Sequence, residues 1–328
     1  MMDFRMNLNL IKMKKLVFLF IVFIMNMNCN DPKNKATDKT GEEMIQQTAK
    51  EKQITYTINA NATIPVAIYF NEIKISEENT PLNSSVDVNG YALKNGKYKI
   101  KIQIFPVFRR GDTTVSPEDI KSCQFTFGSY VRDRATGDIL DPKTYTQLPI
   151  KAPDSPVPYF EQEWEVEIKD LPYDLVGWSK GQDLSKMDKK ELEKKVVSFH
   201  EKVREILNQG NGSQWADLTK KRTAETAVFY YSTPEQQATS VSENKINVEK
   251  YCTNMMIPLE DYELKLYAGG KLATLEKKNH TMEFNHKSPL DIKGWGALIR
   301  KGQKSGAADY RILLYLPEGS NEFVIIRK

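Results

Sequence analysis

The chain has 328 residues, with 47 Lys and Arg, 43 Asp and Glu, three His and three Cys. This length accommodates about two domains of ordinary size, and 40% hydrophobic residues exclude a disordered tail or a fibre. So few cysteines exclude a disulfide-rich scaffold, and together with three scattered histidines they leave little material for a metal centre. We therefore expect no metal and no cofactor.

The first 28 residues have the order of a signal peptide. Lys12, Lys14 and Lys15 precede an unbroken apolar run over residues 16–25. Ten residues extend about 15 Å as a helix, roughly half of a bilayer's hydrocarbon core of about 30 Å, so a transmembrane helix is not expected. Removing residues 1–28 removes a net charge of +3, because Arg5 and the three lysines outweigh Asp3, and leaves the remaining chain at +1.

Cys29 stands directly after this segment. The region resembles the signal of bacterial lipoproteins, in which the thiol of that cysteine accepts a diacylglycerol. The resemblance implies lipidation of Cys29 and attachment to a membrane of the bacterial cell envelope, facing the periplasm or the cell surface; secretory cleavage without a lipid is the alternative. Two acyl chains hold a protein stably on a membrane. The polar residues that follow predict a flexible tether over residues 29–53.

Residues 54–171 have a period of two, which is typical of strands with one buried face. In the clearest case, apolar residues alternate with Lys and Gln at Tyr98, Ile100, Ile102 and Ile104. Asn-Gly pairs and a proline-rich segment supply turns between such stretches. We expect an all-β antiparallel sandwich over residues 54–171, followed by a linker over residues 172–187.

The remaining residues, 188–328, predict an α+β domain. Asp188 and Glu191 are spaced as a capping box before a helix that extends to about residue 207. A second helix is expected over residues 213–231, and residues 234–250 are ambiguous. Expected strands follow at residues 262–267, 271–276, 281–284, 295–300, 310–316 and 323–327, and the first two of these form a hairpin around Gly269 and Gly270.

This order of helices and then a curved antiparallel sheet resembles the nuclear transport factor 2-like fold over residues 188–328. The resemblance implies a cone of helices against a bent sheet, with a pocket in its mouth. Four aromatic residues are candidates to line such a pocket: Trp215, Tyr262, Trp295 and Tyr310. Cys123 and Cys252 could form a disulfide in an oxidising envelope, and two buried free thiols are the alternative.

Catalytic motifs have no support in the sequence. The glutamates at positions 161, 163, 165 and 167 alternate with other residues and therefore form the wet face of one strand, where the pKa of a general acid is not raised. No nucleotide-binding glycine motif and no basic stripe with aromatic residues occurs, so we expect no nucleic-acid partner. We expect no catalytic residue.

The sequence therefore favours a membrane-tethered envelope lipoprotein without catalytic activity that binds a macromolecular partner, most simply a protein, with a protective or immunity-like role as a specific version. The alternative hypothesis is a small-molecule or enzymatic pocket in a cone-shaped C-terminal domain.

Overall fold

The computed structural model describes residues 48–133, 136–278, 281–282 and 290–328. The predicted signal peptide, the lipidation site Cys29 and the tether up to residue 47 lie outside the described residues. The first described element, the short 3-10 helix η1 (Lys50–Lys52), leads directly into the first strand. Among the described helices, none has the length and hydropathy needed to cross a membrane.

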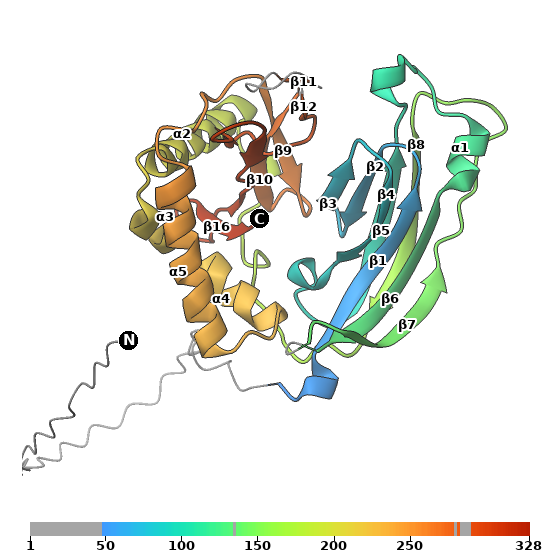
Figure 1. The fold of residues 1–328 in the computed structure, drawn as a ribbon, viewed down its shortest axis with the longest axis horizontal. Helices are drawn as coiled ribbons and strands as arrows, with labels where there is room; N and C mark the ends of the chain where they lie inside the picture. Colours follow the sequence, from blue (N-terminus) through green and yellow to red (C-terminus); the bar gives the residue numbers. More distant parts are fainter. Residues whose placement is uncertain (1–47, 134–135, 279–280, 283–289) are drawn as a thin grey trace, which may run out of the picture. The chain divides into compact units, whose positions relative to one another are not determined.

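The N-terminal half consists of two antiparallel sheets of four strands each (Figure 1). Their strand orders are β4-β1-β6-β7 and β3-β2-β5-β8. The strands are β1 (Ile54–Ala62), β2 (Val66–Phe70), β3 (Ile73–Glu78), β4 (Leu82–Asp87), β5 (Gly96–Ile104), β6 (Gln124–Arg132), β7 (Ile139–Gln147) and β8 (Phe160–Ile168). The short elements between them are η2 (Asn89–Tyr91), η3 (Phe108–Arg110) and α1 (Pro117–Ser122).

Alternate residues of the two sheets share one hydrophobic core. Ile58 of β1, Ile100 of β5 and Phe127 of β6 belong to the same buried cluster. This arrangement confirms the predicted antiparallel, β-rich character of the N-terminal half. The charged residues alternate with the core positions and pair across β5 and β8, for example Lys97 with Glu165 at 2.8 Å. Such exposed pairs contribute little to stability, but they keep this face of the sheet soluble.

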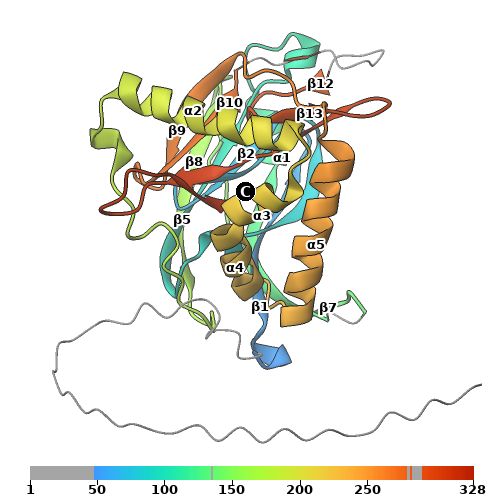
Figure 2. The same cartoon turned by 90° about the vertical axis from the view of Figure 1, so that its left-hand side faces the viewer.

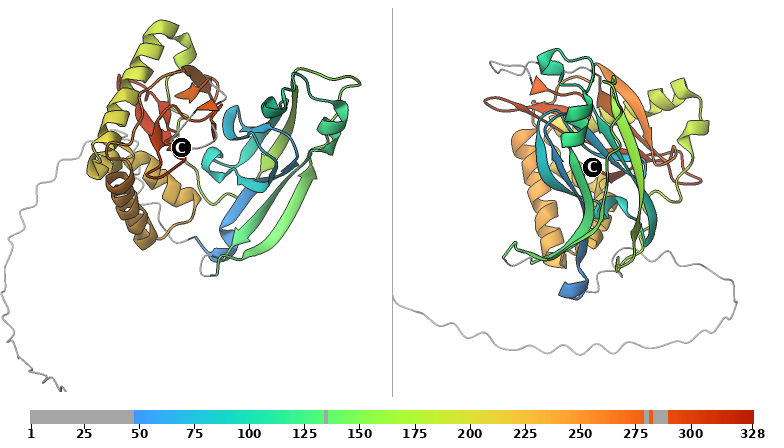
Figure 3. Two further views of the ribbon diagram at one scale, coloured as in Figure 1. Left: turned by 45° about the horizontal axis from the view of Figure 1, so that its top comes forward. Right: turned by 90° about the vertical axis from the view of Figure 1, so that its right-hand side faces the viewer.

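Strand β7 lies at the outer edge of its sheet (Figure 3). All of its residues are exposed, and a free strand edge is a template for unwanted pairing with another chain. Pro142 cannot donate a backbone hydrogen bond, Asp141 has a left-handed φ of 49°, and the register against β6 shifts twice. These irregularities make the edge a poor partner for a further strand.

The C-terminal half contains four helices and a four-stranded sheet of order β16-β15-β10-β9, and Figure 2 shows the helices in front of that sheet. The helices are α2 (Lys189–Asn208), α3 (Gly212–Leu218), α4 (Lys220–Phe229) and α5 (Pro234–Tyr251), and they follow the 3-10 turn η4 (Leu184–Lys186). The sheet strands are β9 (Tyr262–Tyr267), β10 (Leu272–Lys277), β15 (Leu313–Tyr315) and β16 (Val324–Arg327). Two ribbons of two strands each complete the half: β11 (Thr281–Met282) with β12 (Leu290–Asp291), and β13 (Ile299–Lys301) with β14 (Ala307–Asp309).

The helix that begins after Asp188 is confirmed, because this residue is the N-cap and its carboxylate accepts from two backbone N–H groups. The expected single helix over residues 213–231 is wrong in one respect. It is divided at Thr219, which ends α3 while its hydroxyl donates to the carbonyl oxygen of Trp215 at 2.8 Å. The ambiguous segment is a full helix of 18 residues, α5, opened by a capping box at Thr233 and Gln236.

The expected C-terminal meander is correct for the hairpin β9–β10 and for the last two strands. Of the strand expected at 281–284, residues 281–282 form β11 and residues 283–284 lie outside the described residues, while the strand expected at 295–300 begins only at Ile299; the expected pairing of these strands in one meander is wrong. The described strands of this region, β11 to β14, form the two separate ribbons, so β10 pairs with β15 and not with the next strand in sequence. These observations do not test the resemblance to the nuclear transport factor 2-like fold, which stays a prediction.

The segment predicted as a linker is packed between the two halves of the chain. Tyr173 and Leu175 join the core of the N-terminal sheets, while Trp178 packs with Ile73 of β3 and Leu313 of β15. Contacts group the described residues of both halves into one compact unit. The division into domains at residues 54–171 and 188–328 therefore stays a prediction.

Candidate functional site

A buried network of charges connects strand β3 of the N-terminal half to the C-terminal sheet. The ammonium group of Lys74 lies 2.5 Å from the carboxylate of Glu276, and it also pairs with Glu77. Arg311 pairs with the same Glu276, and the hydroxyl of Tyr267 donates to it at 2.7 Å. Burial alone would raise the pKa of Glu276, but Arg311 and Lys74 hold it below its usual value, so the carboxylate is charged.

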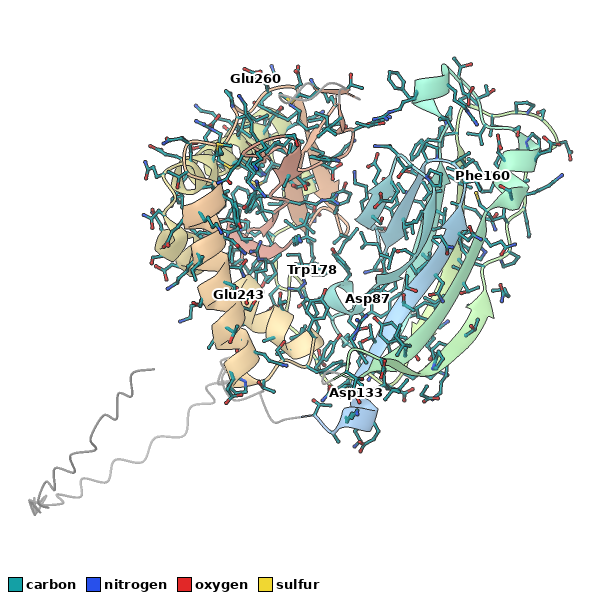
Figure 4. The ribbon with its side chains drawn as sticks, in the orientation of Figure 1. Asp87, Asp133, Phe160, Trp178, Glu243 and Glu260 are labelled. Atoms are coloured by element: carbon teal, nitrogen blue, oxygen red, sulfur yellow. The ribbon has the colours of Figure 1, made fainter. Side chains whose placement is uncertain are left out.

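A cleft of about 690 Å³ opens beside this network. Residues of β3, β4 and η2 line one wall, and residues of α4, α5, β14 and β16 line the other. Figure 4 labels Asp87, which lines the cleft, and Trp178, which contacts one of its arginines; both lie between the N-terminal strands and the C-terminal helices. Three arginines contribute to the lining: Arg222, Arg311 and Arg327. We call this site the arginine cleft.

Arg222 is a cation without an acidic partner among the residues that the structure describes. It projects from α4, and its guanidinium lies 5.1 Å from the ring centre of Trp215. Although the whole side chain is only half-buried, desolvation of its charged end lowers the pKa of Arg222 to about 10, and no carboxylate offsets this effect. The group remains protonated at neutral pH, with donors that the described protein residues do not use.

The other two arginines each have one buried nitrogen without an acceptor. In Arg327, Nη1 donates to Glu225 at 2.7 Å and Nε donates to the carbonyl oxygen of Gly90 at 2.5 Å, while Nη2 has no partner among the described residues. In Arg311, one Nη donates to Glu276, and Nε has no partner there. Leaving a buried N–H donor unpaired costs about 1–3 kcal/mol. Because these two nitrogens are buried, an anion in the cleft would interact with Arg311 and Arg327 through their charge, and the reachable donors would come from Arg222.

Three of the four acidic residues that line the cleft already have hydrogen-bonding or ion-pair partners. Glu77 pairs with Lys74, and Asp309 accepts from the backbone N–H of Gly296 at 2.8 Å. Asp87 accepts from the hydroxyl of Tyr130 at 2.9 Å, and burial raises the pKa of both Asp87 and Glu78. The unused hydrogen-bonding capacity thus belongs mainly to the arginines, which suits an anionic ligand.

The four aromatic residues expected to line a C-terminal pocket lie elsewhere. Trp215 and Tyr310 pack edge to face in the C-terminal core, with ring centres 6.1 Å apart, and Tyr262 packs at the margin of that core. Trp295 packs in a separate cluster around Ile257. None of the four lines the arginine cleft, although Trp215 supports it indirectly through Arg222.

The disulfide considered between Cys123 and Cys252 is wrong, because both residues are buried free thiols. They belong to different cores: Cys123 contacts the carbonyl oxygen of Asp119 at 3.5 Å, whereas Cys252 contacts the hydroxyl of Tyr310 at 2.9 Å. Burial raises the pKa of each thiol, so neither is activated as a nucleophile.

Sequence reasoning did not single out the three arginines. One signal was available, because only ten of the 47 basic residues are Arg, and Arg is the residue that binds planar anions through two donors. Arg327 also occupies a buried position in a strand whose other residues are apolar. Within the described residues, no group of three or more His, Cys, Asp or Glu side chains is arranged to hold a metal ion. No protein-family model, no curated protein and no solved structure matches this chain.

Proposed function

We propose that this chain is a lipid-anchored protein of the bacterial cell envelope, without catalytic activity, that binds a protein partner by holding an anionic group of that partner in the arginine cleft. The signal-like segment and Cys29 support the anchor. The single observation that carries the binding function is that three arginines line one cleft, among them Arg222, which has no acidic partner among the described residues.

The chemistry of these groups favours binding over proton transfer. A general acid or base needs a pKa near the working pH, whereas the pKa of Arg222 stays about three units above neutrality even after burial has lowered it to about 10. A guanidinium offers several N–H donors in one plane, which match the oxygens of a carboxylate or a phosphate. The cleft is therefore suited to holding such a group in place.

The anion would gain hydrogen bonds to a charged group, Arg222. Such hydrogen bonds contribute about 1.5–3 kcal/mol each. A partner that presents one carboxylate or phosphate at the right place could thus be bound selectively even if the rest of its contact surface were small.

Site-specific crosslinking in cells that produce the full chain tests this function. A photo-crosslinking residue at Thr226, which lines the arginine cleft, should capture a partner protein, whereas the same residue at the exposed Lys195 on α2 should not. Arg222→Gln should abolish the capture at Thr226. A Cys29→Ala variant, labelled with a fatty-acid analogue, should lose both the label and the membrane fraction.

The outcomes are separable. Equal capture at Thr226 and Lys195, or capture at Thr226 that survives Arg222→Gln, would contradict binding in the cleft. Retention of the fatty-acid label by Cys29→Ala would contradict the anchor without affecting the cleft.

A further inference from the structure

The outer face of the β4-β1-β6-β7 sheet carries a group of uncharged polar side chains. We call it the amide face, and it consists of Asn59, Asn61, Asn83, Ser85, Gln124, Thr126 and Gln147. The strand register places them in two rows across the sheet. In one row Asn61 is paired with Asn83 and Gln124, and in the next Asn59 is paired with Ser85 and Thr126, which is itself paired with Gln147.

The side on which the amide face lies follows from the positions of the core residues. The residues that alternate with the amide face, such as Ile58, Ala60 and Phe125, are buried between the two N-terminal sheets. Because successive side chains of a strand point to opposite faces, the amide face points away from the core. The rows also lie before the register shift that begins after Phe127, so the pairing beneath them is regular.

The absence of charge distinguishes this surface from the corresponding face of the other sheet. There, Lys and Glu side chains form cross-strand ion pairs, among them Lys97 with Glu165 and Lys101 with Glu161. The amide face is instead hollowed, with a volume of about 710 Å³, and no residue lining the hollow is charged. Pro149 and Ile150 form its apolar margin, whereas the other apolar lining residues, Ala60, Phe125 and Leu148, are buried.

Some side chains of the amide face are fixed by hydrogen bonds to one another, and others are available to bind a ligand. The hydroxyl of Ser85 donates to the side-chain oxygen of Asn59 at 2.6 Å, and the amide nitrogen of Asn59 donates to Thr126 at 3.1 Å. The exposed amides around this chain of bonds, namely those of Asn61, Asn83, Gln124 and Gln147, make no side-chain hydrogen bond within the described part of the protein. Each of them offers a donor and an acceptor side by side.

We propose that the amide face binds a neutral oligosaccharide. A hydroxyl group of a sugar both donates and accepts, so adjacent hydroxyls match the paired donor and acceptor of a side-chain amide. Neighbouring strands are about 4.8 Å apart, a spacing similar to the width of one pyranose ring, so successive rings can meet amides on successive strands. The apolar margin contacts the C–H face of a sugar, and an uncharged site gives an ionised ligand no electrostatic attraction.

This site is separate from the arginine cleft and does not depend on the proposed function. Asp87, two residues beyond Ser85 on β4, already lines the cleft, so the two sites are neighbours on the same sheet but have different chemistry. The amide face has no cation to hold the anionic group that the arginines would take.

Isothermal titration of the full chain, with its lipid anchor removed by Cys29→Ser, tests the inference. The probes are chitohexaose, cellohexaose and maltohexaose, with hexagalacturonate as the anionic comparison. We expect at least one neutral hexasaccharide to bind with a Kd below about 1 mM, which corresponds to about −4 kcal/mol, and hexagalacturonate to bind more weakly. The double variant Asn61→Asp and Gln124→Glu should weaken that binding by about tenfold or more, because each change removes a donor and adds a charge.

Two controls separate this site from others. Gln214→Glu alters an exposed amide on α3 in the same chemical way and should leave the affinity unchanged. Arg222→Gln in the arginine cleft should also leave it unchanged. Failure of every neutral hexasaccharide to bind, stronger binding of hexagalacturonate, or binding that the double variant does not weaken while its unfolding midpoint matches that of the unmodified chain, would each overturn the proposal.

Discussion

The position of Arg222 is energetically unfavourable for a charged side chain. Its charge is desolvated, its pKa is lowered to about 10, and its described surroundings provide an aromatic ring but no carboxylate. A cation–π contact of this kind contributes about 0.5–1 kcal/mol at partly exposed sites, which is smaller than the desolvation penalty that the lowered pKa implies. The residue is therefore better explained by a ligand than by the stability of the fold.

This explanation predicts the effect of Arg222→Met on stability. The substitution keeps an unbranched apolar stem against Trp215 and removes the desolvated charge, so the free energy of unfolding should rise, or fall by less than about 1 kcal/mol. Urea unfolding of both proteins measures this difference. A loss of more than about 2 kcal/mol would show that Arg222 mainly stabilises the fold.

His200 makes stability depend on pH. Its ring is buried on α2, with Nδ1–H donating to the carbonyl oxygen of Val196 at 2.9 Å, and burial lowers the pKa of His200 from its usual value of 6.5 to about 4. Below pH 6.5 the unfolded chain therefore binds a proton that the folded chain does not. Stability from this residue should be fully present above pH 6.5 and decrease as the pH falls towards 4, by about 3 kcal/mol in total.

Comparison with His200→Asn isolates this effect from that of the carboxylates. Unfolding free energies of the two proteins, measured between pH 7 and pH 4, should converge as the pH falls. Parallel curves would exclude His200 as the source of the pH dependence.

Among the elements, α5 depends most on its ends. It has 18 residues, yet Val248 is its single fully buried residue, so little apolar burial supports it. Its capping box lets the hydroxyl of Thr233 accept from the backbone N–H of Gln236, while the side chain of Gln236 accepts from the N–H of Thr233. The capping box satisfies two backbone donors that would otherwise be unpaired at this end.

Thr233→Ala should lower the free energy of unfolding by about 1 kcal/mol, because the first turn of α5 loses its cap. Ser242→Ala, at an exposed position within the same helix, should be neutral or slightly stabilising, because Ala is the better helix former. Denaturant unfolding with circular dichroism measures both. An equal effect of the two substitutions would contradict the role of the cap.

The sequence predicted those elements whose buried face has a clear period. Strands β1, β5 and β8 alternate apolar and polar residues, and α2 repeats apolar residues at helical spacing after its cap. Helix α5 lacks that repeat, and the division at Thr219 depends on a side-chain hydrogen bond that no periodicity records. The pairing expected for β11 and β13 was wrong because a chain can leave a sheet and return to it without any local signal.

At the scale of the whole molecule, the network around Glu276 is expected to make the two halves unfold together. Lys74 and Glu276 are 202 positions apart in sequence, and both are almost fully buried. Removing one member of a buried charged network typically costs about 3–5 kcal/mol, because the partner charge remains buried. Glu276→Gln should therefore lower stability by about that amount.

The same variant tests cooperativity. In the unmodified chain, tryptophan fluorescence and far-ultraviolet circular dichroism should give one coincident unfolding transition. In Glu276→Gln we expect the transition to shift to lower denaturant and to broaden or to divide in two. Two transitions already present in the unmodified chain would support two independent domains at the predicted boundaries.

The arginine cleft could not have been predicted because its parts come from distant positions. Arg222, Arg311 and Arg327 lie in a helix, a loop and a strand, and no motif spans them. Local patterns report which face of an element is buried, but they do not report which elements will face one another. The predicted pocket residues were chosen for their chemistry, but Trp215 is buried in a hydrophobic core and the other three, Tyr262, Trp295 and Tyr310, are partly buried against one.

Because β16 comes late in the sequence, one wall of the arginine cleft is synthesised long after the other. Arg327 is supplied by that strand, whereas the opposite wall is made by β3 and β4, roughly 250 positions earlier. At about 5–20 residues per second, the early wall exists for more than ten seconds before the last arginine is made. A growing chain therefore cannot hold an anion with all three arginines, and the complete cleft exists only after β16 has been made and has paired with β15.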